Sequence, residues 1–306
     1  MKNTQPKKIR LVSCDLNGTL VHQHTMMDMI RLGFPHAPER YEKAKDVFTR
    51  QTSGLLSMKE TFEIAGPLTK GLSLRNAIEY ARSEMRFLEG FEEFISALRE
   101  KGIYFVINST GYTVTTEVIK AVYGPENFYD AICNRLIFGR EGDPDKLVSD
   151  HDISDLVKDY FLKRTGDRAE SVKANDCQPV TSTKKFSDSV DTVTENCYDE
   201  ILTTGEVELG IRDENEKARL IFEIADKLNI SREAVAHIGD TMGDSGGISE
   251  VAGNGGLGIA FNYNNALKNH LEGILKNKEI SGKIVLTEPK SETSDLRCLL
   301  NLMLDA

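Results

Sequence analysis

Short apolar runs that end at a polar residue constrain the fold of this chain more than any other feature. Residues 9–15 read IRLVSCD, residues 103–108 read IYFVIN, and residues 234–238 read AVAHI before a Gly-Asp turn. Similar but shorter runs occupy residues 131–133, 257–261 and 283–286. Runs this short and this apolar are typical of strands that are covered on both faces of a sheet.

Helical patterns separate these predicted strands. A helix predicted over residues 91–99 stops at Gly102, immediately before the next strand. A second helix is predicted over residues 215–229, and a last one near residues 296–304. This alternation of helix, glycine stop and strand indicates an α/β fold with a mostly parallel sheet.

Two long segments depart from this alternation. Residues 21–87 follow a helical pattern throughout, with apolar side chains at helical spacing in three places. Residues 140–205 carry nine basic and fifteen acidic residues, a net charge of −6. Within that acidic insertion, residues 153–161 place apolar side chains on one helix face, and the Ser/Thr/Asp-rich residues 174–195 are predicted to form a mobile loop.

Composition excludes several classes of protein. A net charge of −10 is unfavourable for binding a nucleic-acid backbone, which requires clustered Lys and Arg. No run approaches the ~18 consecutive apolar residues of a membrane span, and the basic start lacks the apolar stretch of a secretory signal. The five cysteines are scattered without Cys-x-x-Cys spacing, which argues against a disulfide framework or a structural zinc site. We expect a cytoplasmic protein without nucleic-acid or membrane partners. The sequence does not decide whether the chain forms an oligomer.

Polar residues that suit phosphate chemistry follow the predicted strands. The first strand ends in Asp15-Leu-Asn-Gly-Thr-Leu20, Ser109 follows the second, and Gly239-Asp-Thr-Met-Gly-Asp244 follows a third. Lys217 stands at the start of a predicted helix. Because the carboxyl ends of parallel strands share one edge of a sheet, we expect these residues to meet there.

The residue types in this set favour phosphoryl transfer. A carboxylate can attack phosphorus and form an aspartyl phosphate. A divalent metal held by carboxylates offsets the repulsion between that nucleophile and the phosphate. A lysine and a hydroxyl can then bind the phosphoryl oxygens, where charge spreads in the transition state. A pocket that offers oxygen ligands alone favours magnesium over zinc.

The set of motifs resembles the four motifs of the haloacid dehalogenase (HAD) superfamily, most closely in its phosphoserine-phosphatase-like branch. All four occur in the expected order, with Lys217 lying 23 residues before Asp240. Residues 134–138 (NRLIF) and 257–262 (LGIAFN) also resemble segments of this branch. The resemblance covers the chain outside the acidic insertion.

The resemblance implies both a domain division and residue roles. It implies a HAD-type Rossmann-like core with a helical cap, the core formed by residues 1–20, 88–139 and 206–306 and the cap by residues 21–87. The nucleophile would be Asp15, and the magnesium ligands would be Asp15, the backbone carbonyl of Asn17, Asp240 and Asp244. The phosphoryl group would be held by Ser109 and Lys217, and the further substrate-binding positions would be Gln23, Glu63, Thr110, Gly111 and Asn262.

Position 17 departs from the phosphatase pattern, which has Asp two residues after the nucleophile. That Asp protonates the leaving group and then activates water, whereas the Asn17 amide cannot exchange a proton near neutral pH. A positioned acid–base group is worth ~10²–10⁴-fold in rate. Three explanations stay open: an engineered Asp→Asn change, a natural phosphatase that is slow or takes a good leaving group, and a protein that binds a phosphorylated ligand without turnover.

The positions aligned with substrate contacts of phosphoserine phosphatases also differ. Gln23 replaces a Glu that meets the substrate amine, and Glu63 replaces an Arg that meets the substrate carboxylate. Glu63 would repel a carboxylate, which argues against phosphoserine itself. Carbon–halogen cleavage is disfavoured because the metal-free dehalogenases lack the acidic pair Asp240 and Asp244.

The sequence therefore predicts a magnesium-dependent hydrolase that acts on a small phosphomonoester through an aspartyl phosphate. The alternative is a catalytically weakened HAD-fold protein that binds a phosphorylated ligand in a regulatory role. The acidic insertion is predicted with equal weight as a second cap or lid over the site and as a surface elaboration for oligomer formation. His22 and His24 are too few for a metal site and suit surface or hinge positions.

Overall fold

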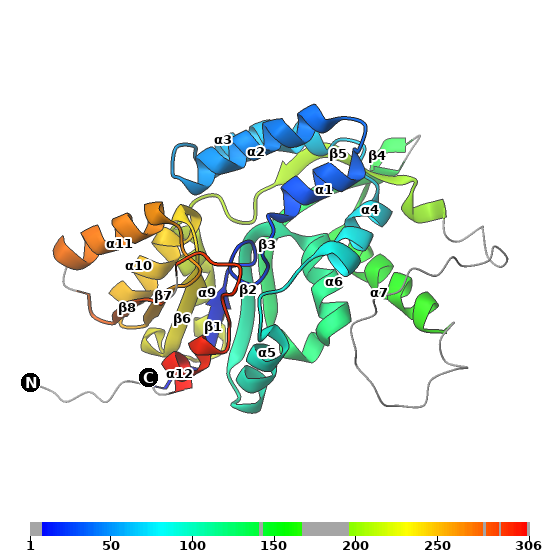
Figure 1. Ribbon diagram of the computed structural model, residues 1–306. Coiled ribbons are helices and arrows are strands. Elements are labelled where there is room, and N and C mark those ends of the chain that lie inside the picture. Colours follow the sequence, from blue (N-terminus) through cyan, green and yellow to red (C-terminus); the bar gives the residue numbers. More distant parts are fainter. Residues whose placement is uncertain (1–7, 141–142, 167–195, 278–279, 288, 305–306) are drawn as a thin grey trace, which may run out of the picture.

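The centre of the fold is an eight-stranded sheet in the order β4-β3-β2-β1-β6-β7-β8, with β5 also paired to β3 (Figure 1). The computed structural model describes residues 8–140, 143–166, 196–277, 280–287 and 289–304. The parallel strands are β1 (Leu11–Cys14), β2 (Tyr104–Tyr112), β3 (Asp130–Arg140), β6 (Val235–Gly239), β7 (Leu257–Ala260) and β8 (Lys283–Leu286). The predicted α/β class and the mostly parallel sheet are confirmed.

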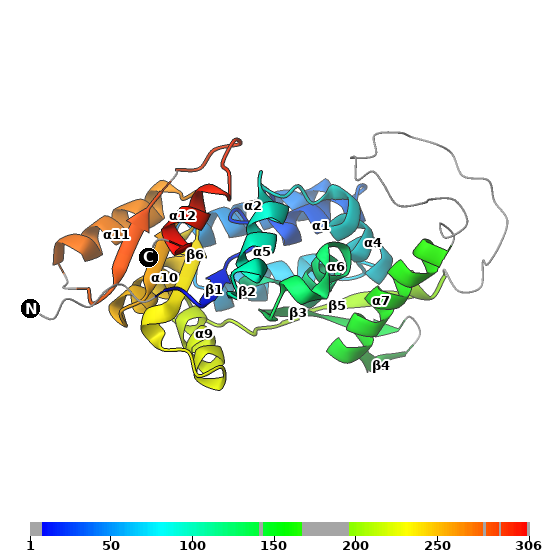
Figure 2. The same cartoon turned by 90° about the horizontal axis from the view of Figure 1, so that it is seen from below.

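Helices cover both faces of the parallel strands, as Figure 2 shows for α9 on one side of β1 and for α5 with α12 on the other. Leu11 of β1 packs with the α9 side, whereas its neighbour Val12 packs with the α5 side. Both faces of β1 are therefore dry, which explains its uninterrupted apolar sequence. The helices around the sheet are α5 (Phe91–Glu100), α6 (Thr113–Tyr123), α9 (Glu216–Lys227), α10 (Ser245–Gly253), α11 (Asn265–Asn277) and α12 (Cys298–Leu304).

A group of helices, here called the helical layer (residues 25–84), lies over the carboxyl ends of the strands (Figure 1). Its elements are α1 (Thr25–Gly33), α2 (Pro38–Thr52), α3 (Met58–Ala65), the 3-10 turn η1 (Gly66–Thr69), α4 (Leu74–Glu79) and the π-helical turn η2 (Tyr80–Glu84). Two chain connections join this layer to the sheet and run side by side: Leu88 N–H donates to the Leu20 carbonyl (2.9 Å), and His22 N–H donates to the Arg86 carbonyl (3.0 Å).

The acidic insertion begins where β3 continues beyond the core. It contains β4 (Asp143–Val148), α7 (Asp150–Gly166) and β5 (Ile201–Glu208), and both of its strands are antiparallel to β3. Phe138, Val157 and Ile201 from this region share one hydrophobic cluster with the helical layer. The helix predicted at residues 153–161 lies within α7, whereas the predicted loop at 174–195 falls in residues 167–195, outside the described residues.

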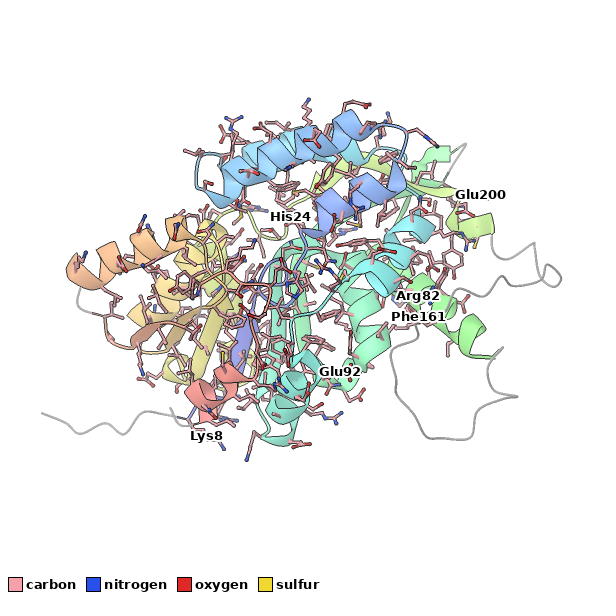
Figure 3. The ribbon with its side chains drawn as sticks, in the orientation of Figure 1. Lys8, His24, Arg82, Glu92, Phe161 and Glu200 are labelled. Atoms are coloured by element: carbon pink, nitrogen blue, oxygen red, sulfur yellow. The ribbon has the colours of Figure 1, made fainter. Side chains whose placement is uncertain are left out.

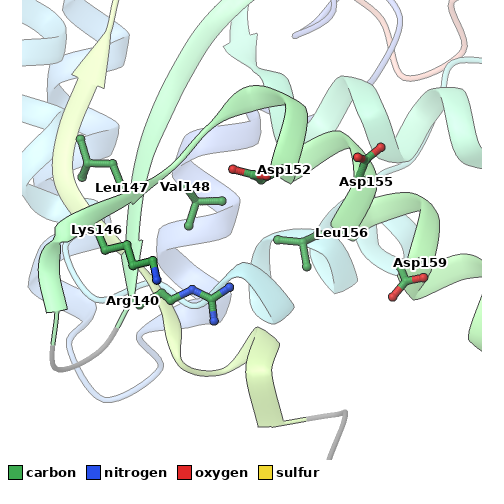
Figure 4. Close-up of a pocket in the computed structure, with 8 residues that line it drawn as sticks. All are labelled: Arg140, Lys146, Leu147, Val148, Asp152, Asp155, Leu156 and Asp159. Carbon is green, nitrogen blue, oxygen red and sulfur yellow. The ribbon is translucent and has the colours of Figure 1, made fainter.

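A surface hollow of about 470 Å³ lies on the insertion, and its lining residues belong to none of the four motifs (Figure 4). Figure 4 shows Arg140 and Lys146 on the strand side and Asp152, Asp155 and Asp159 along α7. Because both signs of charge line it, the hollow shows no preference for one ionic ligand. Separately, no helix in the described part of the chain combines the length and apolar character needed to cross a membrane.

The other helical elements within the described residues are short 3-10 turns: η3 (Pro125–Asn127), η4 (Asn196–Tyr198), η5 (Arg232–Ala234) and η6 (Met242–Asp244). Of these, η6 is important for the site because it follows β6 directly and carries one of the acidic residues of the fourth motif.

Candidate active site

Asp15 follows β1 at the carboxyl edge of the sheet, and its side chain is buried. Its backbone N–H donates to the Ile238 carbonyl (2.9 Å), which extends the pairing of β1 with β6 by one residue. Three residues on, Gly18 has a φ of +80°, and a Cβ atom there would collide with the Asp240 carboxylate. Only glycine therefore allows the turn after Asp15 to lie against Asp240.

Asp240 and Asp244 are held at opposite ends of the turn that contains η6. Oδ2 of Asp244 accepts hydrogen bonds from the backbone N–H groups of Asp240 (3.1 Å) and Thr241 (3.3 Å). This capping arrangement satisfies donors that begin the turn and fixes the Asp244 carboxylate. Its second oxygen, Oδ1, is thereby directed toward the Lys217 side chain.

Lys217 lies in the first turn of α9, and its side chain is only about 2% exposed. Nζ donates to Oδ1 of Asp15 (2.8 Å) and to Oδ1 of Asp244 (2.5 Å). Residues more than 200 positions apart in the chain thus form one buried ion-pair network. A buried ammonium is stable only with such partners, so the position of Lys217 depends on both carboxylates.

Burial and mutual repulsion shift the ionisation of this cluster. Burial raises the pKa of Asp15 to about 6, although the Lys217 ammonium lowers it. Burial, with repulsion from Asp244 and Asp15, raises the pKa of Asp240 well above its usual value. For Asp244 burial acts in the same direction, but the Lys217 ammonium outweighs it and lowers the pKa of that carboxyl. Burial opposes the charge on Lys217 too, yet Asp15 and Asp244 raise its pKa overall.

The three aspartates fit a divalent cation. Oxygen atoms of Asp15, Asp240 and Asp244 lie within 4.8 Å of one another, and all three side chains are buried. When all three are ionised, one lysine leaves an excess of two negative charges, which a divalent ion neutralises. The donors are carboxylate oxygens alone, the set that magnesium prefers in proteins. The raised pKa of Asp240 follows from the same crowding of negative charge that a bound cation would relieve.

The end of β2 supplies a hydroxyl to the same edge. Ser109 is fully buried, and its hydroxyl hydrogen bond is among the causes that lower the pKa of Asp15. Oγ of Ser109 also accepts the Gly111 backbone N–H (3.1 Å), which fixes the serine rotamer. Thr110 lines the cavity beside Asp15, whereas Gly111 contacts the site only through Ser109.

A buried polar network supports these groups from within the sheet. His237 on β6 is paired in register with Ser13 on β1, and Nδ1 of His237 lies 2.9 Å from Oγ of Ser13. Nδ2 of Asn108 donates both to Oγ of Ser13 (3.0 Å) and to the backbone carbonyl of Lys217 (2.9 Å). Since Ser13 accepts from Asn108, its own proton is available to Nδ1 of His237. Nε2 then carries the imidazole hydrogen and faces Oδ1 of Asp244 at 3.7 Å.

A cavity of about 130 Å³ opens above the aspartates. Residues that end or follow the strands, or that begin α9, line it on the sheet side, among them Asp15, Asn17, Thr110, Lys217, Asp240, Asp244, Asn264 and Lys290. The helical layer and the connection to it contribute His22, Gln23, His24, Gln51 and Thr52. Figure 3 places His24 between the helical layer and the sheet. Nδ2 of Asn264 donates to the Thr52 carbonyl at the end of α2 (3.1 Å), so the helical layer closes directly onto the core. The enclosed volume suits a small ligand.

Asn17 lies on the wall of this cavity and also binds the first residue of the helical layer. Its Oδ1 accepts the backbone N–H of Thr25 (3.0 Å), the first residue of α1. The amide oxygen is therefore engaged by the protein, and the amide nitrogen is the group left for a ligand.

Sequence comparison identifies the family of this site. The haloacid dehalogenase-like hydrolase family matches residues 12–172, just over half of the chain. The chain belongs to the haloacid dehalogenase-like hydrolase family. The motif resemblance is thereby confirmed at the level of the family, and the relatives below confirm the phosphoserine-phosphatase-like branch.

Two curated relatives of this HAD protein are phosphatases. A phosphoserine phosphatase of Archaeoglobus fulgidus is 24% identical over 280 residues, which is 92% of this chain and 60% of that protein. A 2-hydroxy-3-keto-5-methylthiopentenyl-1-phosphate phosphatase of Lysinibacillus sphaericus is 24% identical over 156 residues, which is 51% of this chain and 64% of that protein. The chain thus spans less than two thirds of the length of these relatives.

Solved structures share the fold over nearly the whole chain. A phospho-aspartyl intermediate analogue of phosphoserine phosphatase has a TM-score of 0.62 at 21% identity and covers 97% of this chain and 100% of its own. A substrate-bound phosphoserine phosphatase complex has a TM-score of 0.62 at 20% identity, with 97% and 99% covered. At this identity the likeness establishes the HAD fold.

Three positions aligned with family substrate contacts have other partners in the structure. Both ends of the Gln23 amide are used by the connection at residues 84–86, donating to the Glu84 carbonyl (2.8 Å) and accepting the Arg86 N–H (2.9 Å). Glu63 is 63% exposed and pairs with Lys59 one turn away (3.8 Å), because the buried face of α3 is formed by other residues: Met58, Thr61, Phe62 and Ala65. The structure does not bring Glu63 into the cavity.

Asn262 is buried beneath the cavity instead of lining it. Its Nδ2 donates to the Gly18 carbonyl, and its Oδ1 accepts from the Ser291 N–H (2.9 Å) and from the Ser294 hydroxyl (3.1 Å). These hydrogen bonds join the turn after β1 to the segment after β8, so the Asn262 amide supports the site from outside the cavity.

The sequence analysis missed several residues that the structure places at the site. His237 lies within an apolar strand, and its spacing from the motif residues does not mark it as part of a site. A histidine in a strand predicted to be fully buried could still have indicated a polar partner inside the sheet. Lys290 follows β8 in a segment without helical or strand periodicity. His22 and His24, expected at the surface or a hinge, line the cavity.

Proposed function

We propose that this chain is a phosphomonoester hydrolase that acts on a small phosphorylated metabolite through a phosphorylated Asp15. The observation that carries the proposal is the buried Lys217 ammonium held between Asp15 and Asp244, beside Asp240, at the carboxyl edge of the sheet. Both curated relatives are phosphatases, which supports the same reaction class.

In the first half-reaction an oxygen of Asp15 attacks phosphorus, so that a bond from Asp15 to phosphorus forms while the ester oxygen departs with its electron pair. With a pKa of about 6, Asp15 is ionised at neutral pH and available as the nucleophile. Lys217 and Ser109 bind the phosphoryl oxygens, whose charge grows in the transition state.

Magnesium would be held by the carboxylates of Asp15, Asp240 and Asp244, with the backbone carbonyl of Asn17 as a further ligand. When bound, the ion supplies neutralising charge between the nucleophile and the phosphate. The three carboxylates of the chain then remain ionised together, which their mutual repulsion otherwise prevents.

In the second half-reaction water attacks phosphorus, the bond to Asp15 breaks, and inorganic phosphate leaves. The attacking water must lose a proton, and the Asn17 amide cannot accept it. The nitrogen of Asn17 can donate a hydrogen bond to the departing ester oxygen but cannot protonate it. We therefore expect the phosphorylated form of Asp15 to be long-lived, with a substrate whose leaving group departs readily.

The helical layer acts as the cap in this proposal. It closes the cavity through the contact between Asn264 and Thr52, and Gln23 clamps the paired connections on which it would open. The described part of the acidic insertion shares the hydrophobic cluster of the helical layer and would move with it.

Phosphate release from a panel of small phosphomonoesters, with magnesium or with chelator, tests the proposal. Asp15→Asn is the matched control because it keeps the shape of the side chain and removes the nucleophile. We expect release that requires magnesium and that the control variant abolishes. Release that persists in Asp15→Asn would show that another group performs the chemistry.

Asn17 specifically favours a second candidate function, a HAD-fold protein that binds a phosphorylated ligand without turnover. In that case magnesium with beryllofluoride would raise the melting temperature of the chain, because the phosphoryl site is intact. The natural chain would then bind phosphorylated ligands without releasing phosphate, whatever the Asn17→Asp variant does. Phosphate release by the natural chain above the level of Asp15→Asn would exclude this candidate.

A further inference from the structure

The chain segment after β8 returns to the carboxyl edge of the sheet before it descends to α12 (Figure 1). The Lys290 backbone N–H donates to the Tyr263 carbonyl (3.0 Å), and the next N–H, of Ser291, donates to Oδ1 of Asn262 (2.9 Å). Lys290 is therefore anchored on both sides of its Cα by residues that follow β7.

One buried amide connects this segment to the nucleophile turn. Asn262 is 2% exposed and has a φ of 53°, a left-handed conformation that asparagine tolerates. It accepts from Ser291 and Ser294 while its nitrogen donates to the Gly18 carbonyl. The backbone at Lys290 thus has a fixed position relative to the turn that carries Asp15.

The Lys290 side chain lines the cavity at the boundary between the sheet and the helical layer. The Lys290 ammonium also acts on His24, where its charge adds to the larger effect of burial in lowering the pKa of that imidazole. No carboxylate of a described residue lies within 4.0 Å of its ammonium. Among the described residues, the Lys290 ammonium therefore has no carboxylate partner.

The other side chains opposite the aspartates are uncharged hydrogen-bonding groups. Gln51, Thr52 and Asn264 are neutral, and burial lowers the pKa of His24 to about 4, so His24 is neutral as well. Nδ1 of His24 has no hydrogen-bond partner among the described residues. Among the described lining residues, no carboxylate outside the Asp15 cluster is available to pair with a substrate ammonium.

We propose that Lys290 binds a carboxylate on the leaving-group side of the substrate, so that the preferred ligands are phosphorylated hydroxy acids without an ammonium group. This inference rests on the proposed phosphatase function and specifies its substrate class. The cavity of about 130 Å³ limits the leaving group to a few heavy atoms, and a carboxylate is the smallest anionic group that Lys290 can pair with. A charge-assisted contact of this kind is worth roughly tenfold to hundredfold in affinity.

Two ligands that differ at one group test the inference: 3-phosphoglycerate carries a carboxylate where glycerol 3-phosphate carries a hydroxymethyl group. Dissociation constants are measured by calorimetry with magnesium for the natural chain, for Lys290→Met and for Lys227→Met. Lys227 is the matched control because it is exposed at the far end of α9, about 15 Å along the helix from Lys217.

We expect the natural chain and Lys227→Met to bind 3-phosphoglycerate roughly tenfold to hundredfold more tightly than glycerol 3-phosphate. Lys290→Met should reduce that ratio to about one, and O-phosphoserine should bind no more tightly than 3-phosphoglycerate. A natural chain without preference overturns the inference. An equal weakening of both ligands by Lys290→Met also overturns it, since Lys290 would then bind the phosphoryl group itself.

The outcome distinguishes the inference from the function on which it rests. If both ligands bind with magnesium but without preference, the phosphoryl site stands and only the role of Lys290 fails. If neither phosphoester nor inorganic phosphate binds, and Asn17→Asp releases no phosphate, the proposed function and the inference fail together.

Discussion

Replacing Asn17 by aspartate restores the one group that the phosphatase chemistry requires and this chain lacks. Oδ1 of Asn17 is fixed by the Thr25 N–H (3.0 Å), so an aspartate keeps that hydrogen bond and places its second oxygen where the amide nitrogen now lines the cavity. The new carboxyl would lie among three other acidic side chains, which raises its pKa and favours the protonated form that a general acid needs.

The expected gain follows from the role of such a group. A positioned acid–base residue contributes ~10²–10⁴-fold, which corresponds to about 3–5 kcal/mol of barrier. Steady-state hydrolysis of p-nitrophenyl phosphate and of an alkyl phosphate with magnesium measures it. The alkyl ester should gain more, because its leaving group depends more on protonation.

A stability measurement checks that the new carboxylate lies in the acidic cluster. With chelator, Asn17→Asp should melt at a lower temperature than the natural chain, and magnesium should remove most of that difference. Asn17→Ala is the control, since it loses the hydrogen bond to Thr25 without adding charge. If Asn17→Asp stays folded, becomes sensitive to magnesium, and yet hydrolyses neither ester faster, position 17 is not the site of proton transfer and the reasoning is refuted.

Three further predictions concern the architecture of the site. Gly18→Ala should abolish phosphate release and lower the melting temperature by more than Gly71→Ala does. Both glycines have a positive φ, which costs an alanine ~1–3 kcal/mol, but of the two only Gly18 would bring a Cβ atom against another residue. Equal losses of stability in the two variants would contradict the predicted collision. His237→Phe should weaken magnesium binding ~10–100-fold, because Asp244 loses the imidazole N–H that faces it. The magnesium dependence of the melting temperature measures this affinity. An unchanged affinity would exclude a positioning role for His237. His24 has a pKa of about 4 in the folded chain and 6.5 in the unfolded chain, so the unfolded chain binds the proton first as the pH falls. The free energy of unfolding should therefore decrease by about 3 kcal/mol as the pH drops through this interval. In denaturant titrations, His24→Phe should make the free energy of unfolding less dependent on pH over the same interval.

The catalytic edge of the sheet could be predicted because its residues follow regular elements. Asp15 and Asp240 come directly after buried apolar strands, and Lys217 begins an amphipathic helix, so parallel pairing alone brings them to one edge. The same periodicity predicted the six parallel strands and the α/β class. Local pattern and global fold agree in this part of the chain.

The insertion was harder to predict because its strands depend on pairing more than on local sequence. β4 (Asp143–Val148) contains a proline and two aspartates, which are disfavoured in strands, and it forms an edge beside β3. β5 has only a weak alternation, and its position is fixed partly by the hydrogen bonds of Thr203 with the helical layer. Such contacts carry no signal at the level of one sequence.

Alignment predicted the residues that line the cavity only in part, because position does not reveal which hydrogen bonds are already used. Gln23 and Thr110 line the cavity as predicted, yet backbone groups occupy the Gln23 amide. Glu63 belongs to the outer face of its helix. Conversely, Lys290 enters the cavity only because a buried asparagine holds its segment there, a relation between loops that no periodic pattern encodes.

The central claim is that Asp15 carries the phosphoryl group during turnover. The natural chain is incubated with magnesium and a reactive phosphomonoester, stopped with acid and mapped by peptide mass spectrometry. We expect one phosphoryl group on the peptide at Asp15, accumulating in the natural chain because Asn17 cannot activate water, less abundant in Asn17→Asp and absent in Asp15→Asn. Phosphate release without a phosphorylated Asp15, or a phosphoryl group on another residue, would contradict the account.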